Sequence, residues 1–513
     1  MVKITGNDLA IEQIIHVAFG NEQVELEEKT KNVIQYSNHL LNENLKKDFP
    51  YYGINTGYGI FHTQKISNEH LAELNRNLIL SHAVGTGDDF DAATVRAAML
   101  IRANSLAKGF SGVRLVLIQT LIDMLNCGVT PQVRSQGSMG SSGDLCQLAQ
   151  MALVVTRDEK DLDEESGHAW VQKQLFSGKE AMYRAGIQRV RLEPKEGLAL
   201  INGATFSAAL AAINCWFGQE LCEIADQCLA LSMETLLARK EAFDARLQVA
   251  RGMIGQMDSA KNVWDAIQGS TFINSSNHVQ DGYAIGCAPQ VHGAIRDSLA
   301  HAWNIITREI NAATDNPLLF PNGDVISGGN FHGEPTALVM DFLGIALAEL
   351  GAISERRTFR LLDSHLNNGL PTMLIADAEK AGLESGLMIP QYSAASLVME
   401  NQHLANSDAV HSLPTSANQE DHNSNSLTAA RHTYLIAKNV LRILSIELYT
   451  AAHGMEIRKT QHPERKLGAG TGKILAGVRK VVTFHAHDTL WGNEIDQLLN
   501  SLEKDIFFHK MKD

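Results

Sequence analysis

The tripeptide Ser141-Ser142-Gly143 lies within a run of small residues, Ser-Met-Gly-Ser-Ser-Gly-Asp, at positions 138–144. Because Gly143 has no Cβ, its backbone nitrogen is able to approach the carbonyl of Ser141 closely. If that nitrogen attacks, and water is lost from the ring and from Ser142, a five-membered electrophile results. Ordinary side chains offer no strong electrophile, and the elimination of an amine from an amino acid needs one. The same glycine-flanked residues are also typical of a plain turn before a helix.

Five further stretches of the sequence are rich in polar or titratable groups and are expected to be loops. They supply phenols, an imidazole, amides and a carboxylate, the groups that general acid–base chemistry uses. Each stretch alone also fits a structural interpretation, such as a core tyrosine or a solvated carboxylate. Together they favour an enzyme over a helical scaffold or a binding module. The stretches are Tyr52–Gly59, Ser81–Ala83, Asn202-Gly203, Gln280–Tyr283 and Ser416–Ser424.

The elements that must position these loops are predicted to be mostly helices, since Ala, Leu, Glu and Gln are abundant and prolines number only 11. Residues 157–196 are charged and turn-rich, and predict a surface excursion with a short hairpin. The sequence therefore predicts an all-α fold. Its N-terminal region, residues 1–200, would carry the electrophile loop, and residues 201–513 would form a long helical bundle. The main helical segments are expected at 24–48, at 90–126 as two helices with a break near 108–112, at 336–364 and at 427–455.

Composition limits the classes of partner. The chain has 513 residues, of which 44% are hydrophobic and 20% charged, and a net charge of −14. That charge argues against nucleic acid or an anionic membrane as a partner and fits an enzyme of small molecules. No uncharged apolar run reaches the roughly 18 residues of a membrane span.

The spacing of the cysteines and histidines indicates which cellular compartment to expect and whether to expect a bound metal ion. The six cysteines form no Cys-x-x-Cys pair and no disulfide framework, and the first residues lack an apolar signal core. A reduced, cytoplasmic location is therefore expected. The histidines lack the spacing of metal ligands, so no metal is predicted.

The motifs in their order along the chain resemble the aromatic amino acid ammonia-lyases, and within them most closely the histidine ammonia-lyases. The resemblance runs from about Tyr52 to Glu420. It rests on Tyr-Gly-Ile-Asn-Thr-Gly-Tyr-Gly at 52–59, Ser-His-Ala at 81–83, the run at 138–144, Leu-Ala-Leu-Ile-Asn-Gly at 198–203, Gln-Asp-Gly-Tyr at 280–283, Ser-Gly-Gly-Asn-Phe-His-Gly at 327–333 and Thr-Ser-Ala-Asn-Gln-Glu-Asp-His at 415–422.

This resemblance implies a fold, a prosthetic group and an assembly. The fold is the long helical bundle of the histidine ammonia-lyase and fumarase type. In the family the tripeptide cyclises to 4-methylidene-imidazole-5-one, whose methylidene carbon would come from Ser142. Ser141 replaces the usual alanine, whose side chain takes no part in ring closure. The resemblance also implies a homotetramer in which each active site takes residues from several subunits.

The resemblance assigns roles in an elimination that converts histidine to trans-urocanate and ammonia. Tyr52 is the candidate base that removes a β-proton. Asn202 and Tyr283 would line the electrophile, and Glu420 would lie near the amine or the imidazole ring. The remaining family positions that would line the substrate pocket are His82, Gln280 and Phe331.

One family position departs from the pattern. The motif around Tyr283 normally has an arginine three residues later, which binds the substrate carboxylate, but here that residue is Gly286. Loss of such a bidentate, charge-assisted pair should cost several kcal/mol. Gln147 and Gln150 likewise replace the usual proline and histidine.

The missing arginine leaves alternatives open. The chain is either a histidine lyase that binds the carboxylate otherwise, or a lyase of a modified histidine. An ergothionase, which releases trimethylamine from ergothioneine without needing the ring, is an example of the second kind. An inactive or regulatory relative and an aromatic amino acid 2,3-aminomutase are further alternatives, since lyases and mutases share the ring chemistry.

Overall fold

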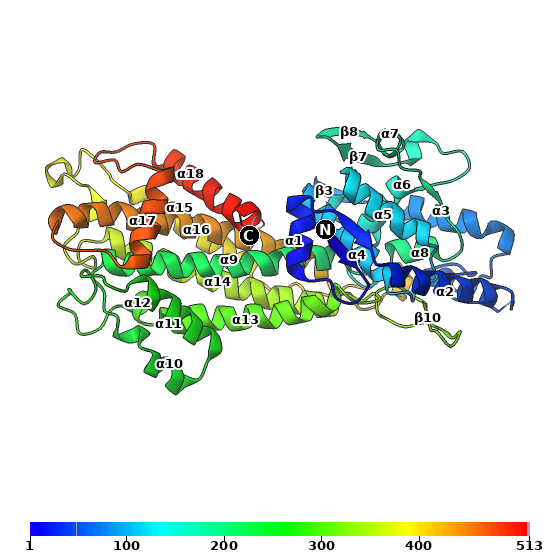
Figure 1. Ribbon diagram of the computed structural model, residues 1–513, viewed down its shortest axis with the longest axis horizontal. Coiled ribbons are helices and arrows are strands. Elements are labelled where there is room, and N and C mark those ends of the chain that lie inside the picture. The colour runs from blue at the N-terminus through cyan, green and yellow to red at the C-terminus, as the bar shows by residue number, and fades with distance from the viewer. Residues whose placement is uncertain (48, 510–513) are drawn as a thin grey trace. The chain divides into compact units, whose positions relative to one another are not determined.

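The computed structural model describes residues 1–47 and 49–509 and is built almost entirely from helices (Figure 1). The predicted all-α class is confirmed, because every strand in the described part of the chain is two to four residues long. The chain divides into two compact units. Unit 1 is Met1–Trp216, Trp303–Asp341 and Ser407–Arg431, and unit 2 is Phe217–Ala302, Phe342–Asn406 and His432–Asp513. The boundary expected near residue 200 stays a prediction.

Unit 1 combines short helices with small two- and three-stranded sheets. Its helices are α1 (Ile11–Gly20), α2 (Glu28–Leu45), α3 (Leu71–His82), α4 (Ala92–Ala107), α5 (Leu115–Cys127), α6 (Leu145–Val155), α7 (Gly178–Arg184) and α8 (Glu196–Ile201). The break expected in 90–126 lies between α4 and α5. The expectation of a helix over 24–48 is wrong at its start. Residues 24–26 form a strand that pairs with residues 2–4, and the helix begins only at Glu28.

The sheets of unit 1 are small, each with two or three short strands. The predicted hairpin within 157–196 is confirmed as the antiparallel pair β7 and β8. The strands are β1 (Val2–Ile4), β2 (Val24–Leu26), β3 (Thr86–Asp89), β4 (Thr130–Pro131), β5 (Arg134–Gln136), β6 (Thr156–Arg157), β7 (His168–Val171), β8 (Gln174–Ser177), β9 (Val190–Arg191), β10 (Leu318–Leu319) and β11 (Val325–Ile326). The pairings are β1–β2, β3–β5, β4–β7–β8, β6–β9 and β10–β11.

Helix α4 is the core of unit 1. The Asp91 side chain caps its first turn by accepting a hydrogen bond from the Thr94 amide, and every residue from Ala93 to Ala107 is buried. A helix that is buried on all sides needs an apolar surface all round, and Ala, Val, Met, Leu and Ile supply most of it. Two arginines of this helix, Arg96 and Arg102, are buried as well. Arg96 donates hydrogen bonds to backbone carbonyls, and Arg102 donates to backbone carbonyls and to two threonine hydroxyls.

Four long helices have residues in both units: α9 (Thr205–Thr235), α13 (Ala288–Glu309), α14 (Glu334–Leu362) and α16 (Ser426–Gln461). Those expected at 336–364 and 427–455 correspond to α14 and α16. By length and composition alone α14 could cross a membrane, but 61% of its apolar window is buried inside the protein, which is usual for a core helix.

Unit 2 is a helical bundle. Within it α9, α14 and α16 run side by side (Figure 1), and the fully buried Glu447 of α16 joins all three. Its carboxylate accepts hydrogen bonds from Ser232 at 2.8 Å, Ser354 at 2.7 Å and the Arg357 guanidinium at 2.6 Å. The other helices are α10 (Ala245–Arg251), α11 (Ile254–Ala266), α12 (Tyr283–Gly286), α15 (Met388–Leu404), α17 (Ala469–Val481) and α18 (Trp491–Lys504).

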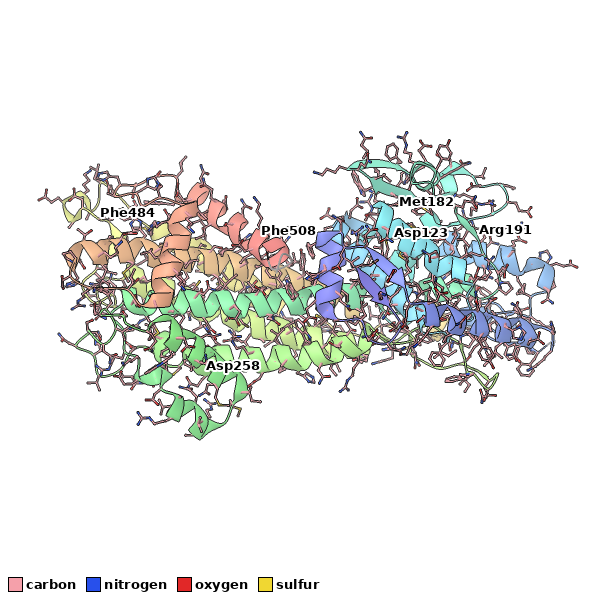
Figure 2. All side chains as sticks on the ribbon, viewed as in Figure 1. Asp123, Met182, Arg191, Asp258, Phe484 and Phe508 are labelled. Atoms are coloured by element: carbon pink, nitrogen blue, oxygen red, sulfur yellow. The ribbon has the colours of Figure 1, made fainter. Side chains whose placement is uncertain are left out.

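The connection between α17 and α18 folds over one end of α16. Phe484, labelled in Figure 2, lies in this connection, and its ring packs against His453 of α16 with centroids 4.8 Å apart. The Trp491 indole packs edge-on against the same imidazole at 5.6 Å. These aromatic contacts bury His453 in unit 2.

Candidate active site

A cavity of about 1210 Å³ in unit 1 brings together residues that are far apart in the sequence. Its walls come from the loop between α2 and α3, helix α3, the segment before α6, the segment after α8, the segment between α13 and α14, and the loop before α16. Seven of the predicted site residues line it: Tyr52, His82, Ser141, Ser142, Asn202, Phe331 and Glu420. Gly143 follows Ser142 in the chain, is buried and does not itself line the cavity.

The tripeptide is held in a tight backbone cradle. Gly143 has φ +76°, and a Cβ built there would lie 2.0 Å from the carbonyl carbon of Gly203. Only glycine fits that position, for reasons of both conformation and space. The Ser142 carbonyl oxygen accepts hydrogen bonds from the Asn202 side-chain amide at 3.0 Å and from the Gly203 amide at 3.2 Å. The segment is therefore pressed against a second glycine instead of forming a free turn.

Glu420 holds the hydroxyls of the tripeptide. Its Oε1 accepts a hydrogen bond from Ser142 Oγ at 2.5 Å, and its Oε2 accepts one from Ser141 Oγ at 2.8 Å. Thr415 Oγ1 also donates to Oε2 at 3.1 Å. The carboxylate is thus fixed by three hydroxyl groups, and one of its two oxygens points at the hydroxyl that ring formation would remove.

Asp144 anchors the other side of the tripeptide and was not singled out by the sequence. Its side chain is completely buried and accepts hydrogen bonds from Ser138 Oγ at 2.8 Å, the Ser207 amide at 2.8 Å and Ser207 Oγ at 2.9 Å. Burial raises the pKa of this carboxyl, while the three hydrogen bonds oppose that rise. The Asp144 amide also donates to the Gly203 carbonyl at 2.9 Å, so the residue ties the tripeptide to α9 and to the glycine cradle.

Two phenols from the loop between α2 and α3, Tyr52 and Tyr58, line the cavity. Tyr52 Oη accepts a hydrogen bond from the Gly59 amide at 3.3 Å, which orients the phenol at the cavity wall. Tyr58 lines the same cavity, but its hydroxyl is buried without a hydrogen-bond partner in the described structure. Burial, and secondarily the neighbouring Tyr52, raise the pKa of Tyr58 far above its usual value. Tyr52 is therefore the better placed of the two phenols to act as a base.

His82 ends α3 at the cavity wall. Its Nδ1 lies 3.0 Å from Ser81 Oγ, and burial lowers the pKa of the imidazole, although Glu420 partly offsets this. A neutral imidazole both donates and accepts, so His82 suits a ligand ring of the same kind. Phe331, in the segment before α14, is half-buried and supplies an apolar surface to the cavity.

Three predicted site residues are found elsewhere. Gln280, Tyr283 and Gly286 belong to unit 2 and do not line the cavity described above. Tyr283 opens the short helix α12 and is 72% exposed. A Cβ at Gly286 would meet only the Asp281 carbonyl oxygen, at 3.5 Å, so the backbone leaves room for a larger side chain. The roles of these three residues stay predictions.

The titratable groups that line the cavity are of three kinds. Its titratable lining groups in the described structure are tyrosines, carboxylates and the imidazoles of His62, His82, His332 and His422, with no lysine or arginine. His332 and His422 stack with centroids 5.8 Å apart, and neither was predicted as a site residue. No group of three His, Cys, Asp or Glu side chains within residues 1–47 and 49–509 is arranged to hold a metal ion.

The two glutamines that depart from the family pattern have a structural role. Gln150 Oε1 accepts a hydrogen bond from the Arg134 amide at 2.9 Å, and Gln147 Nε2 donates to the Arg134 carbonyl at 3.3 Å. Together they hold the backbone of β5 against α6. Neither residue lines the cavity.

The chain resembles known proteins in family, sequence and structure. The family model described as aromatic amino acid lyase matches residues 9–480. Histidine ammonia-lyase of Caldanaerobacter subterraneus subsp. tengcongensis is 46% identical over 484 residues, covering 94% of this chain and 92% of that protein. Histidine ammonia-lyase of Treponema denticola is 43% identical over 506 residues, covering 98% and 97%.

Solved structures of similar fold include both lyases and aminomutases. Histidine ammonia-lyase from Trypanosoma cruzi superposes with a TM-score of 0.89 at 32% identity, covering 100% of this chain and 95% of that one. Phenylalanine aminomutase of Pantoea agglomerans superposes with a TM-score of 0.92 at 30% identity, covering 99% and 100%.

Proposed function

The chain belongs to the aromatic amino acid lyase family, and on that premise we propose that it eliminates ammonia from L-histidine to give trans-urocanate. The observation that carries the proposal is the cradle around Ser142 and Gly143, on the wall of a cavity that also holds Tyr52, His82 and Glu420. Full-length similarity to histidine ammonia-lyases supports the choice of histidine.

The residues present fit the 4-methylidene-imidazole-5-one group. Gly143 has no Cβ to obstruct ring closure, and the Ser142 carbonyl already has two hydrogen-bond donors. The Ser142 hydroxyl, which must leave, is held by a carboxylate. Once formed, the group supplies the electrophile that makes an amino group a better leaving group.

The chain's own side chains would supply the remaining chemistry. Tyr52 would remove the β-proton, since its phenol is oriented at the cavity wall by the Gly59 amide. A positioned base is required because a β-proton next to an aromatic ring is very weakly acidic. Glu420 would hold the substrate amine or imidazole, and His82 would hydrogen-bond the imidazole ring. Phe331 would pack against the substrate.

An assembly would complete the site. We propose a cytoplasmic homotetramer with active sites shared between copies, to which Gln280, Tyr283 and Gly286 contribute. Support comes from the exposure of Tyr283, at 72%, and of the neighbouring Val279, at 94%, because large apolar side chains on a loop are usual at subunit contacts.

A second candidate substrate is a histidine whose amine is modified. The observation that favours it is the lack of arginine and lysine among the described cavity-lining residues, together with glycine at 286. A substrate with a quaternary amine carries its own good leaving group and its own positive charge. A cavity lining without lysine or arginine would not repel such a permanently cationic group.

The proposal is tested by incubating the purified chain with L-histidine and following urocanate by its ultraviolet absorbance, with ammonia measured in parallel. Equimolar urocanate and ammonia are expected. Formation of β-histidine would instead identify an aminomutase. If neither product forms from histidine but ergothioneine yields trimethylamine, the modified substrate is correct and the proposal for histidine is wrong.

A further inference from the structure

Arg102 is a completely buried arginine whose guanidinium lies behind the glycine cradle. One of its nitrogens donates to the carbonyl oxygens of Ala199 and Asn202, the latter at 2.7 Å. The other donates to Thr314 Oγ1 at 3.2 Å and to Thr205 Oγ1 at 3.4 Å. The carbonyls belong to the end of α8 and to the residue after it. A single side chain of α4 therefore fixes the turn that leads from α8 into α9.

The backbone of this turn contacts both the Arg102 guanidinium and the tripeptide, so the position of Arg102 affects that of the tripeptide. A Cβ at Gly203 would lie 2.5 Å from Thr314 Oγ1 and 2.9 Å from the Arg102 guanidinium, so the backbone of Gly203 rests directly on both groups. On its other side Gly203 contacts Gly143, where a Cβ would come within 2.0 Å of the Gly203 carbonyl carbon. The Asn202–Gly203 peptide is thus clamped between the guanidinium and the residue that must close the ring.

The clamped peptide also carries the hydrogen bonds that align the tripeptide. Asn202 Nδ2 and the Gly203 amide both donate to the Ser142 carbonyl, and the Gly203 carbonyl accepts from the Asp144 amide. If the peptide between 202 and 203 moves, all three bonds change together. Burial lowers the pKa of Arg102 to about 10, so the guanidinium remains charged and keeps its donors at neutral pH.

We propose that Arg102 is the positioning residue that presses the Asn202–Gly203 peptide onto the tripeptide and thereby promotes its cyclisation. This inference rests on the proposed function only in requiring that the ring forms. In the first dehydration a bond forms between Gly143 N and the Ser141 carbonyl carbon. The proton of Gly143 N moves to the former carbonyl oxygen, which then leaves as water with the Ser142 amide proton. In the second, the Ser142 hydroxyl leaves as water with the Ser142 α-proton. No oxidant or reductant is needed.

Arg96 is a matched control six residues earlier on the same helix. It is also buried, and its guanidinium donates to the carbonyl oxygens of Val17 at 2.9 Å and Leu125 at 3.0 Å. Neither acceptor belongs to the site. Arg96→Met therefore removes an equivalent buried arginine from the same core without touching the glycine cradle.

The experiment measures intact mass, because cyclisation removes two water molecules from the chain whether or not any substrate is turned over. We expect wild type and Arg96→Met to show the full deficit. In folded Arg102→Met, we expect the cyclised fraction shortly after synthesis to fall about tenfold or more, because several hydrogen bonds from a charged donor are lost. Arg102→Lys should restore part of the deficit, since an ammonium still reaches some of the carbonyls.

The other possible results of this experiment also test the role of Arg102. A folded Arg102→Met chain that cyclises like wild type would overturn the role of Arg102, and so would an equal loss of the ring in Arg96→Met. If Arg102→Met does not fold, Thr314→Val replaces it, since this change removes one acceptor of the guanidinium while keeping the side-chain shape. Slower cyclisation in Thr314→Val is expected, and an unchanged rate would contradict the inference. A wild-type chain of full mass would contradict the ring itself, and the role of Arg102 with it.

Discussion

The Glu420 carboxylate accepts a hydrogen bond from the Ser142 hydroxyl at 2.5 Å, although the two residues are 278 positions apart in the sequence. The same carboxylate accepts one from Ser141 at 2.8 Å. Ring formation would remove the Ser142 hydroxyl, whereas that of Ser141 would stay. Ser141, which stands where the family usually has alanine, would then help to hold Glu420 during catalysis.

Ser141→Ala tests this consequence. The ring should still form, because the side chain of residue 141 takes no part in closure, and intact mass checks this. We expect kcat/KM for histidine to fall about fivefold, as the loss of one hydrogen bond of roughly 1 kcal/mol implies. Ser327→Ala, which changes another cavity-lining serine without a hydrogen bond to Glu420, is the control. Equal activities for the two variants would remove Ser141 from this role.

Tyr52→Phe tests the base. We expect turnover to fall by about 10²–10⁴-fold while the far-ultraviolet circular dichroism and the mass deficit stay those of wild type, because only a proton acceptor is lost. Tyr58→Phe is the matched control, since that phenol lies on the same loop and its hydroxyl has no partner in the described structure. Substantial residual activity in folded Tyr52→Phe would assign the base to another group.

Gly286→Arg tests how the carboxylate is bound. Room for the side chain exists, because a Cβ at this position meets only the Asp281 carbonyl oxygen at 3.5 Å. We expect the KM for histidine to fall about tenfold or more, as a guanidinium fork adds a charge-assisted contact. Gly477→Arg, at an open position of α17, controls for added charge. No improvement in folded Gly286→Arg would mean that the carboxylate is bound by other groups.

The stability of unit 2 should depend on pH through His453. Burial lowers the pKa of this imidazole to about 4 from an ordinary value near 6.5, with Arg479 and His485 adding to the effect, and the ring is only 3% exposed. The unfolded chain therefore binds the proton first as pH falls. The stabilisation is complete above pH 6.5 and is lost as pH falls towards 4, by up to about 3 kcal/mol.

Thermal unfolding of wild type and His453→Asn between pH 4 and 8 checks the sign. The melting temperature of wild type should drop more steeply below pH 6.5 than that of the variant, which has no imidazole at this position. His365→Asn, which changes an imidazole that is 91% exposed, should keep the wild-type dependence. Parallel curves for wild type and His453→Asn would contradict the assignment.

The features that the sequence predicts best are those encoded by neighbouring residues. The break between α4 and α5, the helices α14 and α16, and the β7–β8 hairpin follow from periodicity and turn residues. The pairing of residues 24–26 with the N-terminus was missed, because Val24 and Leu26 also fit the start of an amphipathic helix. Most of the motif loops contribute residues to the cavity lining, whereas the loop at Gln280–Tyr283 belongs to unit 2 and does not.

The sequence predicts the supporting contacts poorly. Arg102 and Asp144 are held by partners far along the chain, such as Thr314, 212 positions from Arg102, and Ser207, 63 positions from Asp144, and no periodicity encodes such distances. One signal was available for Arg102, since a charged side chain within the apolar run of α4 must find acceptors inside the core. Its acceptors could not be inferred without the fold. The same holds for the stacked His332 and His422, which come from separate segments.

The most direct test of the account compares wild type with Ser142→Ala, following urocanate and ammonia from L-histidine together with intact mass. For wild type, we expect equimolar urocanate and ammonia and a deficit of two water molecules. For Ser142→Ala, we expect a chain that folds normally, lacks the ring and forms no urocanate. Histidine turnover by Ser142→Ala at the wild-type rate, or a wild-type chain of full mass that still releases ammonia, would contradict the claim that this tripeptide provides the electrophile.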